Sequence, residues 1–248
     1  MATLAATTVA AQPAATAAQS GGSVLAIGVV ADGKPIAART LAPGQVARFS
    51  LAGRGGQRVT IVQRSSQGNP GPSSEGGCAT NATRLVAPGG RQLAREINCG
   101  LLPAIALPSD GTYLIEVSSE PTDLVDLLLS IFDVPPDVTA TLTVGGPPVA
   151  VTTSAPGQRA QLELEGRAGQ RIGLVQRTAD GATGPNTQPG CWNETTRLLR
   201  SDRQEIASTS SCAPLAPTRL PADGVYTVEV SMLDASTADL TLEAFEQS

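Results

Sequence analysis

Apolar and polar residues alternate along much of this chain with a period of two. In the segment RVTIVQR, Val59, Ile61 and Gln63 fall on one face, and the residues between them fall on the other. In the segment GTYLIEVS, Tyr113 and Ile115 share a face in the same way. Such alternation is typical of strands in an antiparallel sheet that buries one face against a core.

Further strands are predicted at 25–31, 46–52, 83–87 and 124–132. Turn signals such as SDG, ADG and APGQ separate them, because glycine, proline and aspartate favour tight reversals of the chain. No segment shows the 3.6-residue period of an amphipathic helix. Regular short strands of this kind predict an all-β sandwich.

The pattern occurs twice in the chain. The run APGQVARFSLAGRGGQRVTIVQR begins at Ala42 and returns 113 residues later, at Ala155, as APGQRAQLELEGRAGQRIGLVQR. Self-similarity at a fixed shift indicates tandem domains. We therefore expect a low-complexity tail at 1–23 and two tandem antiparallel β-sandwich domains, jelly-roll-like, at 24–136 and 137–248.

The joint between the two copies reads FDVPPDV. Proline fixes its backbone φ angle, so Pro135 and Pro136 leave the joint little slack. We expect the two domains to form a semi-rigid rod.

Composition argues against several classes of function. The net charge is −5, with acidic and basic residues interspersed, so no basic stripe is available for nucleic acid. The chain has no histidine, which removes the Ser-His-Asp and Cys-His arrangements and the usual zinc ligands. No apolar run approaches the roughly 20 residues of a membrane span. We expect a protein that is not an enzyme and has no cofactor, no bound metal, no nucleic-acid partner and no membrane span.

The four cysteines occur as one pair per copy with identical spacing. Three pairings are open to four cysteines, and the repeat favours Cys78–Cys99 and Cys191–Cys212. A metal site is the alternative, but two thiols without histidine make an incomplete ligand set. Each disulfide would stabilise its domain by about 3 kcal/mol. Disulfides predict an extracellular or cell-surface location.

Gln63 and Gln176 occupy equivalent positions on the inward face of a strand. A buried amide requires hydrogen-bond partners. We interpret both side chains as anchors for the backbone of the long segment between the cysteines.

Trp192 is the only tryptophan of the chain and follows Cys191 directly. An exposed tryptophan could provide a contact for a surface glycan. Packing against the neighbouring disulfide is the alternative, and we favour it because aromatic residues make up only 2% of the chain.

Charged side chains also fall on outward strand faces. They are Arg58, Arg64 and Glu116, with the counterparts Arg171, Arg177 and Glu229. Anion binding is one interpretation of these residues, and cross-strand pairing on a solvated sheet face is the one we favour. Asp110 and Asp223 precede glycine in turns, and we interpret them as turn residues rather than as calcium ligands.

Three segments of the second copy carry a resemblance to a known family. They read GGPPVAVTTSAPGQRAQLELEGRAGQRIGL, LPADGVYTVEV and ADLTLEAFE. Together they resemble the bacterial pre-peptidase C-terminal (PPC) type of domain, and the resemblance extends to the first copy. It implies a β-sandwich accessory module of secreted proteins and supplies no catalytic residues.

The N-terminal tail, residues 1–23, is rich in alanine, threonine, glutamine and serine. Three interpretations stay open: a remnant of a signal peptide, a flexible linker, or a strand donated to a neighbouring sheet edge. The hypothesis that we favour is a structural subunit of a surface assembly or filament, which associates with itself through this tail. The alternative is an accessory module that binds carbohydrate or another surface.

Overall fold

The structure is a computed structural model that describes residues 26–66, 78, 80–178, 191 and 193–247. Within these residues the chain forms eighteen β-strands and no helix, nine strands on each side of the joint at 134–137. The prediction of an all-β protein built from two β-sandwiches is confirmed. The described residues therefore include no helix that could span a membrane.

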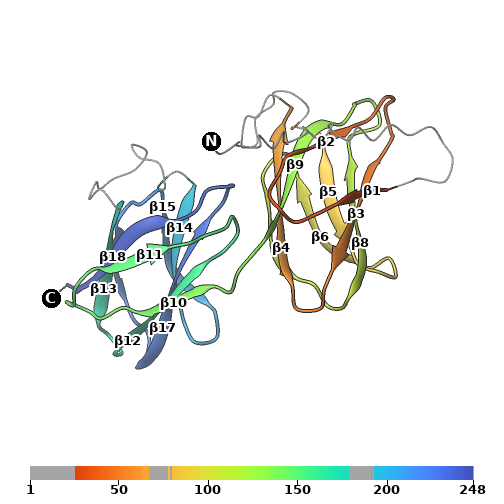
Figure 1. The fold of residues 1–248 in the computed structure, drawn as a ribbon. Coiled ribbons are helices and arrows are strands. Elements are labelled where there is room, and N and C mark those ends of the chain that lie inside the picture. Colours follow the sequence, from red (N-terminus) through yellow and green to blue (C-terminus); the bar gives the residue numbers. More distant parts are fainter. Residues whose placement is uncertain (1–25, 67–77, 79, 179–190, 192, 248) are drawn as a thin grey trace, which may run out of the picture.

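The first domain consists of two facing sheets (Figure 1). Its strands are β1 (Ile27–Val29), β2 (Ile36–Arg39), β3 (Ala47–Gly53), β4 (Arg58–Ser65), β5 (Ala82–Val86), β6 (Gln92–Ile97), β7 (Leu101–Ala106), β8 (Gly111–Ser118) and β9 (Asp126–Asp133). One sheet has the order β1-β3-β8-β5-β6, and the other has the order β2-β9-β4-β7.

The second domain repeats this topology. Its strands are β10 (Val138–Thr141), β11 (Val149–Thr152), β12 (Ala160–Gly166), β13 (Arg171–Thr178), β14 (Glu194–Leu199), β15 (Glu205–Ser210), β16 (Leu215–Arg219), β17 (Gly224–Met232) and β18 (Asp239–Glu246). The sheets have the orders β10-β12-β17-β14-β15 and β11-β18-β13-β16. Every strand boundary lies within two residues of the 113-residue shift that relates the two copies.

The sequence pattern predicted antiparallel sheets, but each domain also contains one parallel pair of strands. The strand β1 runs parallel to β3, and β10 runs parallel to β12, while the other ladders are antiparallel. The reason is that the chain leaves β1 for the opposite sheet, forms β2 there, and returns as β3. A connection of this kind, unlike a two-residue hairpin, allows two strands of one sheet to run in the same direction.

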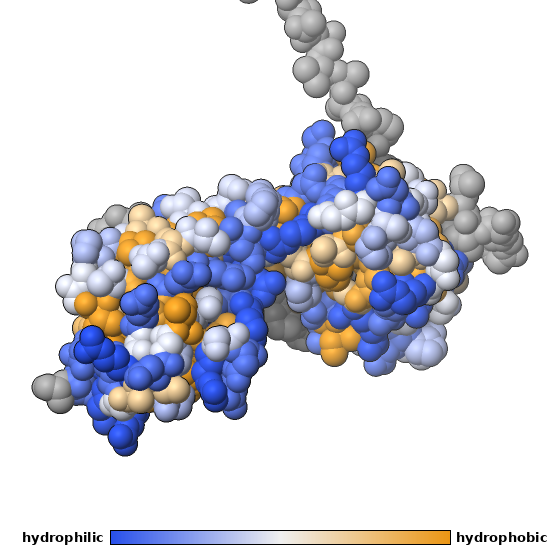
Figure 2. Space-filling model, turned by 90° about the horizontal axis from the view of Figure 1, so that it is seen from below, coloured by the Kyte–Doolittle hydropathy of each residue, from blue (hydrophilic) through white to orange (hydrophobic). Residues whose placement is uncertain are grey.

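Each domain has its own core, and the two cores share no residue. Phe49, Ile61 and Tyr113 are among the fully buried side chains of the first. Each core also contains a tyrosine whose hydroxyl binds the backbone four residues upstream. Tyr113 donates to the Ser109 carbonyl at 2.6 Å, and Tyr226 donates to the Ala222 carbonyl at the same distance. These bonds fix the turn before β8 and the turn before β17. In the space-filling view the domains form two lobes with mixed polar and apolar surfaces (Figure 2).

Candidate functional site at the domain junction

The predicted disulfides are present. Cys78 is bonded to Cys99 and Cys191 to Cys212, with Cα–Cα distances of 4.9 and 5.2 Å. All four cysteines are buried. In each domain the bond ties the segment before the central strand β5 or β14 to the start of the edge strand β7 or β16. Disulfides persist in oxidising compartments, so this protein belongs outside the cytoplasm.

Gln63 and Gln176, the two glutamines predicted on the inward face, are buried and lie next to the disulfides. Gln176 is fully buried, and its Nε2 donates to the Ala213 carbonyl, one residue after Cys212, at 3.1 Å. In the first domain, the backbone N–H of Gln63 donates to the carbonyl of the equivalent residue, Gly100, at 2.8 Å. The link from β13 to the disulfide segment therefore uses a side chain, and the link from β4 uses the backbone.

A carboxyl group that the sequence pattern did not single out joins the network of the second domain. Glu194 is fully buried, and its Oε2 accepts the N–H of Cys212 at 2.9 Å, while its Oε1 contacts the Thr196 hydroxyl. That hydroxyl also lies 2.9 Å from Oε1 of Gln176, which can only accept a hydrogen bond. Since a hydroxyl has one proton, Thr196 cannot donate fully to both oxygens, and a neutral Glu194 carboxyl would supply the second proton that satisfies both contacts. Burial raises the pKa of Glu194 and so favours this state, although its hydrogen bonds with Thr196 and Cys212 act in the opposite direction.

Glu194→Gln should therefore keep the fold and change how stability depends on pH. The glutamine amide donates to Thr196 and accepts from Cys212, as the protonated acid does. In the wild type, the unfolded chain loses the Glu194 proton near the ordinary pKa of 4.5 while the folded chain keeps it to a higher pH, so stability falls as pH rises from that value through the raised pKa. In urea unfolding between acidic and neutral pH, the variant should gain stability relative to the wild type as pH rises. Glu205→Gln, on the exposed start of β15, is the control. A difference between wild type and Glu194→Gln that stays constant with pH would contradict the neutral carboxyl.

Other residues singled out in the sequence lie in turns or outside the described residues. The Asp110 carboxylate accepts the N–H of Gly55, and the Asp223 carboxylate accepts the N–H of Ala168, both at 2.7 Å. Within the described ranges, no three histidine, cysteine, aspartate or glutamate side chains are grouped as metal ligands. Trp192 and the tail at 1–23 lie outside the described residues, so both interpretations of Trp192, packing against the disulfide and contact with a glycan, stay predictions.

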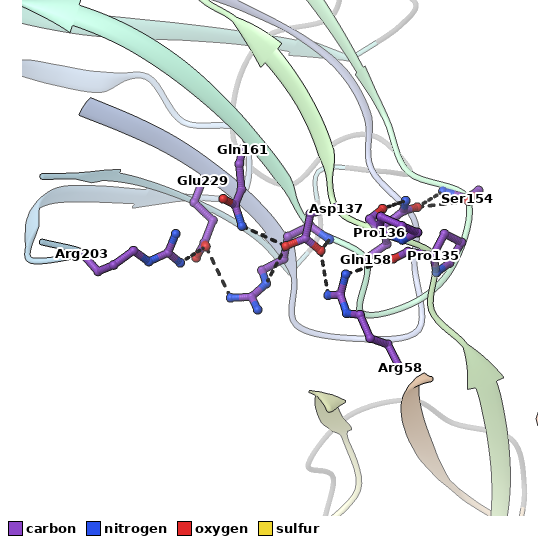
Figure 3. Close-up of polar contacts among 10 residues, drawn as sticks. Arg58, Pro135, Pro136, Asp137, Ser154, Gln158, Gln161, Arg203 and Glu229 are labelled. Carbon is purple, nitrogen blue, oxygen red and sulfur yellow. Dashed lines mark hydrogen bonds and ion pairs between the residues drawn. The ribbon is translucent and has the colours of Figure 1, made fainter. Parts of the chain in front are cut away.

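The linker between the domains is bound by the first domain. Arg58, the first residue of β4, donates to the Pro135 carbonyl at 3.0 Å and to the Asp137 carboxylate at 2.7 Å (Figure 3). Its own carbonyl accepts the N–H of Val134 at 2.8 Å. Alternation had placed Arg58 on a solvated face with a cross-strand partner. That prediction is wrong, because the linker passes over this position and supplies the counter-ion.

The second domain binds the same linker from the other side. Gln158 donates to the Pro136 carbonyl at 2.6 Å, and Gln161 donates to Asp137 at 2.9 Å (Figure 3). The Gln158 carbonyl oxygen Oε1 in turn accepts the N–H of Ser154 at 2.7 Å, which fixes the amide orientation. Each linker residue from 135 to 137 thus makes at least one hydrogen bond with a flanking domain.

The repeated turn APGQ has a different environment in each copy. In the first copy Ala42 and Pro43 are exposed, whereas their counterparts Ala155 and Pro156 are buried. Gly157 lies against Thr60 of β4, so close that a Cβ at Gly157 would lie 3.1 Å from the threonine hydroxyl oxygen. The turn of the second domain therefore packs on the outer face of the first.

This packing corrects a second prediction from alternation. Thr60 and Val62 were expected on the solvated face of β4, but they are only 0% and 4% exposed. The contact with Gly157 removes Thr60 from solvent, and its hydroxyl is satisfied by the Leu102 carbonyl. In the second domain the counterpart of Val62, Val175, is half-buried.

The remaining outward charges differ between the domains. In the first, Glu116 pairs across the sheet with Arg48 at 2.8 Å and with Arg84 at 2.9 Å, as cross-strand pairing predicts. In the second, the counterpart Glu229 is only 2% exposed. Three further arginines of this group, Arg64, Arg171 and Arg177, form no ion pair within the part of the chain that the structure describes, and Arg171 donates to the Pro217 carbonyl.

No protein-family model matches this chain, and no curated protein matches it. Among solved structures, it is similar to PliG of Aeromonas hydrophila, a periplasmic inhibitor of g-type lysozyme, at 16% identity over 45% of this chain and 99% of that one, with a TM-score of 0.33. The CUB1-EGF-CUB2 domains of rat MASP-1 match at 7% identity over 88% of this chain and 100% of that one, with a TM-score of 0.30. The ANX1 ectodomain of Arabidopsis thaliana matches at 9% identity over 87% and 89%, with a TM-score of 0.25. Scores this low support no argument about function.

Proposed function

We propose that this protein is a non-enzymatic, extracellular structural subunit: a two-domain rod of a surface assembly that associates with itself through residues 1–23. The observation that carries the proposal is the junction, where both domains bind the three linker residues. Domains joined by a short linker ordinarily move relative to each other unless their interface prevents it. A subunit that transmits a fixed geometry to its neighbours needs such a junction.

The sheet edges supply acceptors for an added strand. The strands β6 and β15 end their sheets and are paired on one side only. An edge strand of this kind is a template for pairing with another chain. The edge strands β7 and β16 instead contain Pro103 and Pro217, and proline cannot donate to a ladder.

The donor in this proposal is the tail, which contains the uncharged, β-tolerant run TLAATTVAA. Donated to β6 or β15 of the next copy, it would join copies head to tail, and a contact of that type propagates into a filament. No bond is made or broken, so the assembly depends only on backbone pairing and on burial of the tail's apolar side chains.

Negative-stain electron microscopy of the full-length protein beside a version that lacks residues 1–22 tests this assembly. We expect filaments from the full chain and short rods from the truncated one. A full-length Thr7→Pro/Val9→Pro variant is the matched control, since it keeps the length and polarity of the tail but cannot form a regular ladder. It should also give only rods. Short, monodisperse rods from all three proteins would rule out polymerisation through the tail.

A further inference from the structure

The two copies use one arginine–glutamate pair differently. In the first domain, Arg84 of β5 binds Oε2 of Glu116 on β8 at 2.9 Å. In the second domain, the counterparts Arg197 and Glu229 are direct partners in the register of β14 and β17. They nevertheless form no ion pair, because two other arginines hold this glutamate.

Those two arginines belong to the second copy alone. Arg203 binds Oε2 of Glu229 at 2.6 Å (Figure 3). Arg159 approaches the same oxygen at 3.4 Å. The first copy has Gly90 and Val46 at these positions. The guanidinium of Arg197 is consequently left without a hydrogen bond or an ion pair among the described residues, although the residue is half-buried.

Arg197 lines a cleft of about 170 Å³ between the two domains. Leu101, Pro103 and Ala104 of β7 form one wall, and Met232 and Leu233 at the end of β17 lie on the other side. Leu233 is 56% exposed. The cleft therefore places an unpaired cation beside aliphatic side chains that are accessible from solvent.

The junction is positively charged in an acidic protein. Its four arginines, Arg58, Arg159, Arg197 and Arg203, are balanced by three carboxylates, Asp133, Asp137 and Glu229. The excess of one positive charge contrasts with the net charge of −5 of the whole chain. This local positive charge favours the binding of an anionic group at the junction.

We propose that this cleft binds the carboxylate of an aspartate or glutamate side chain from a partner protein, through Arg197. A guanidinium binds a carboxylate through two parallel hydrogen bonds. The cleft is smaller than the roughly 300–1,000 Å³ of small-molecule pockets, so it suits one inserted side chain. Gln158, Ser231 and Glu229, whose carboxylate is held by Arg159 and Arg203, make part of the wall polar. The rest of the wall is aliphatic, so we expect an aliphatic residue next to the acid in the partner, in contact with Leu233. This site is separate from the tail and does not depend on self-assembly.

The test is a titration of the ¹⁵N-labelled full-length protein, followed by the Nε–Hε NMR signals of its arginines. The probe is the peptide Ac-Gly-Leu-Glu-Leu-Gly-NH2, and its glutamine analogue is the control ligand. We expect the Arg197 signal to shift and saturate at millimolar glutamate peptide and to stay in place with the analogue. Arg197→Gln should weaken binding at least about tenfold. The matched variant Arg84→Gln, which removes the paired arginine of the first domain, should leave it unchanged.

Three results would overturn the proposal. The first is an Arg197 signal that does not respond to the glutamate peptide. The second is an equal response to acetate at the same concentration, which would mean that the aliphatic walls contribute nothing. The third is a preference for an oligosaccharide of glucuronic acid over the peptide, which would replace the protein partner with an acidic glycan. The comparison of the two peptides uses the wild-type protein, so it stands whatever Arg197→Gln does to folding.

Discussion

Replacing Cys191 and Cys212 together by alanine will lower the unfolding free energy of the second domain by about 3 kcal/mol. The two cysteines are 21 residues apart in sequence, and their bond restricts the unfolded chain. It also holds the segment that Glu194 and Gln176 bind at Cys212 and Ala213. The loss is a large part of the stability of a domain of this size.

The first domain supplies the control for this experiment. Cys78→Ala/Cys99→Ala removes a bond of the same sequence separation from a core that shares no residue with the second. Trp192 is the only tryptophan, so its fluorescence reports on the second domain. In urea, the fluorescence midpoint should fall for the Cys191/Cys212 variant and stay in place for the other. Equal shifts in both variants would mean that the two domains unfold as one unit.

Gln176→Leu will destabilise the second domain by about 2 kcal/mol or more. The glutamine is fully buried and makes two side-chain hydrogen bonds, one with Thr196 and one with Ala213. Leucine fills a similar volume but leaves the Ala213 carbonyl without this donor, and a buried polar group without a partner costs about 1–3 kcal/mol. The Thr196 hydroxyl can turn to Glu194, which limits the loss at that end of the network.

The equivalent change in the first domain, Gln63→Leu, should cost less. Gln63 accepts one side-chain hydrogen bond, from Thr83 at 2.7 Å, and its buried Nε2 has no partner among the described residues. Leucine removes that unsatisfied group together with the bond, so gain and loss partly cancel. Urea unfolding followed by far-ultraviolet circular dichroism compares both variants with the wild type. A larger loss for Gln63→Leu than for Gln176→Leu would contradict the hydrogen-bond assignment.

The strands, the repeat and the disulfides could be predicted because they follow from local and repeated patterns. Alternation gives the inward face of β4, and identical cysteine spacing in the two copies favours one pairing. The burial of Glu194 was not predicted, although the alignment of the copies contained a signal. Asn81 stands at the equivalent position, and an uncharged residue there is compatible with a site that holds a neutral acid.

The junction could not be predicted, because its residues have different environments in nearly identical sequences. The turn APGQ occurs in both copies, yet it is exposed in the first and buried against the neighbouring domain in the second. The bond between Arg58 and Asp137 joins residues on either side of the domain boundary. Whether an outward arginine faces water or the linker depends on how the two domains pack together. The alternation of residues within one strand contains no information about that packing.

The parallel pairing of β1 with β3 has a mechanical consequence. The strand β1 begins beside the start of β3, whereas β9 ends beside the start of β4, after the turn that follows β3. The chain therefore enters the first sandwich at one end and leaves it at the opposite end. A force that pulls on both ends of the domain acts along β1 and β9, so that the hydrogen bonds of their ladders are strained together, in shear. Strands pulled in this direction resist separation as a group, whereas a terminal hairpin pulled from one end would open one bond at a time.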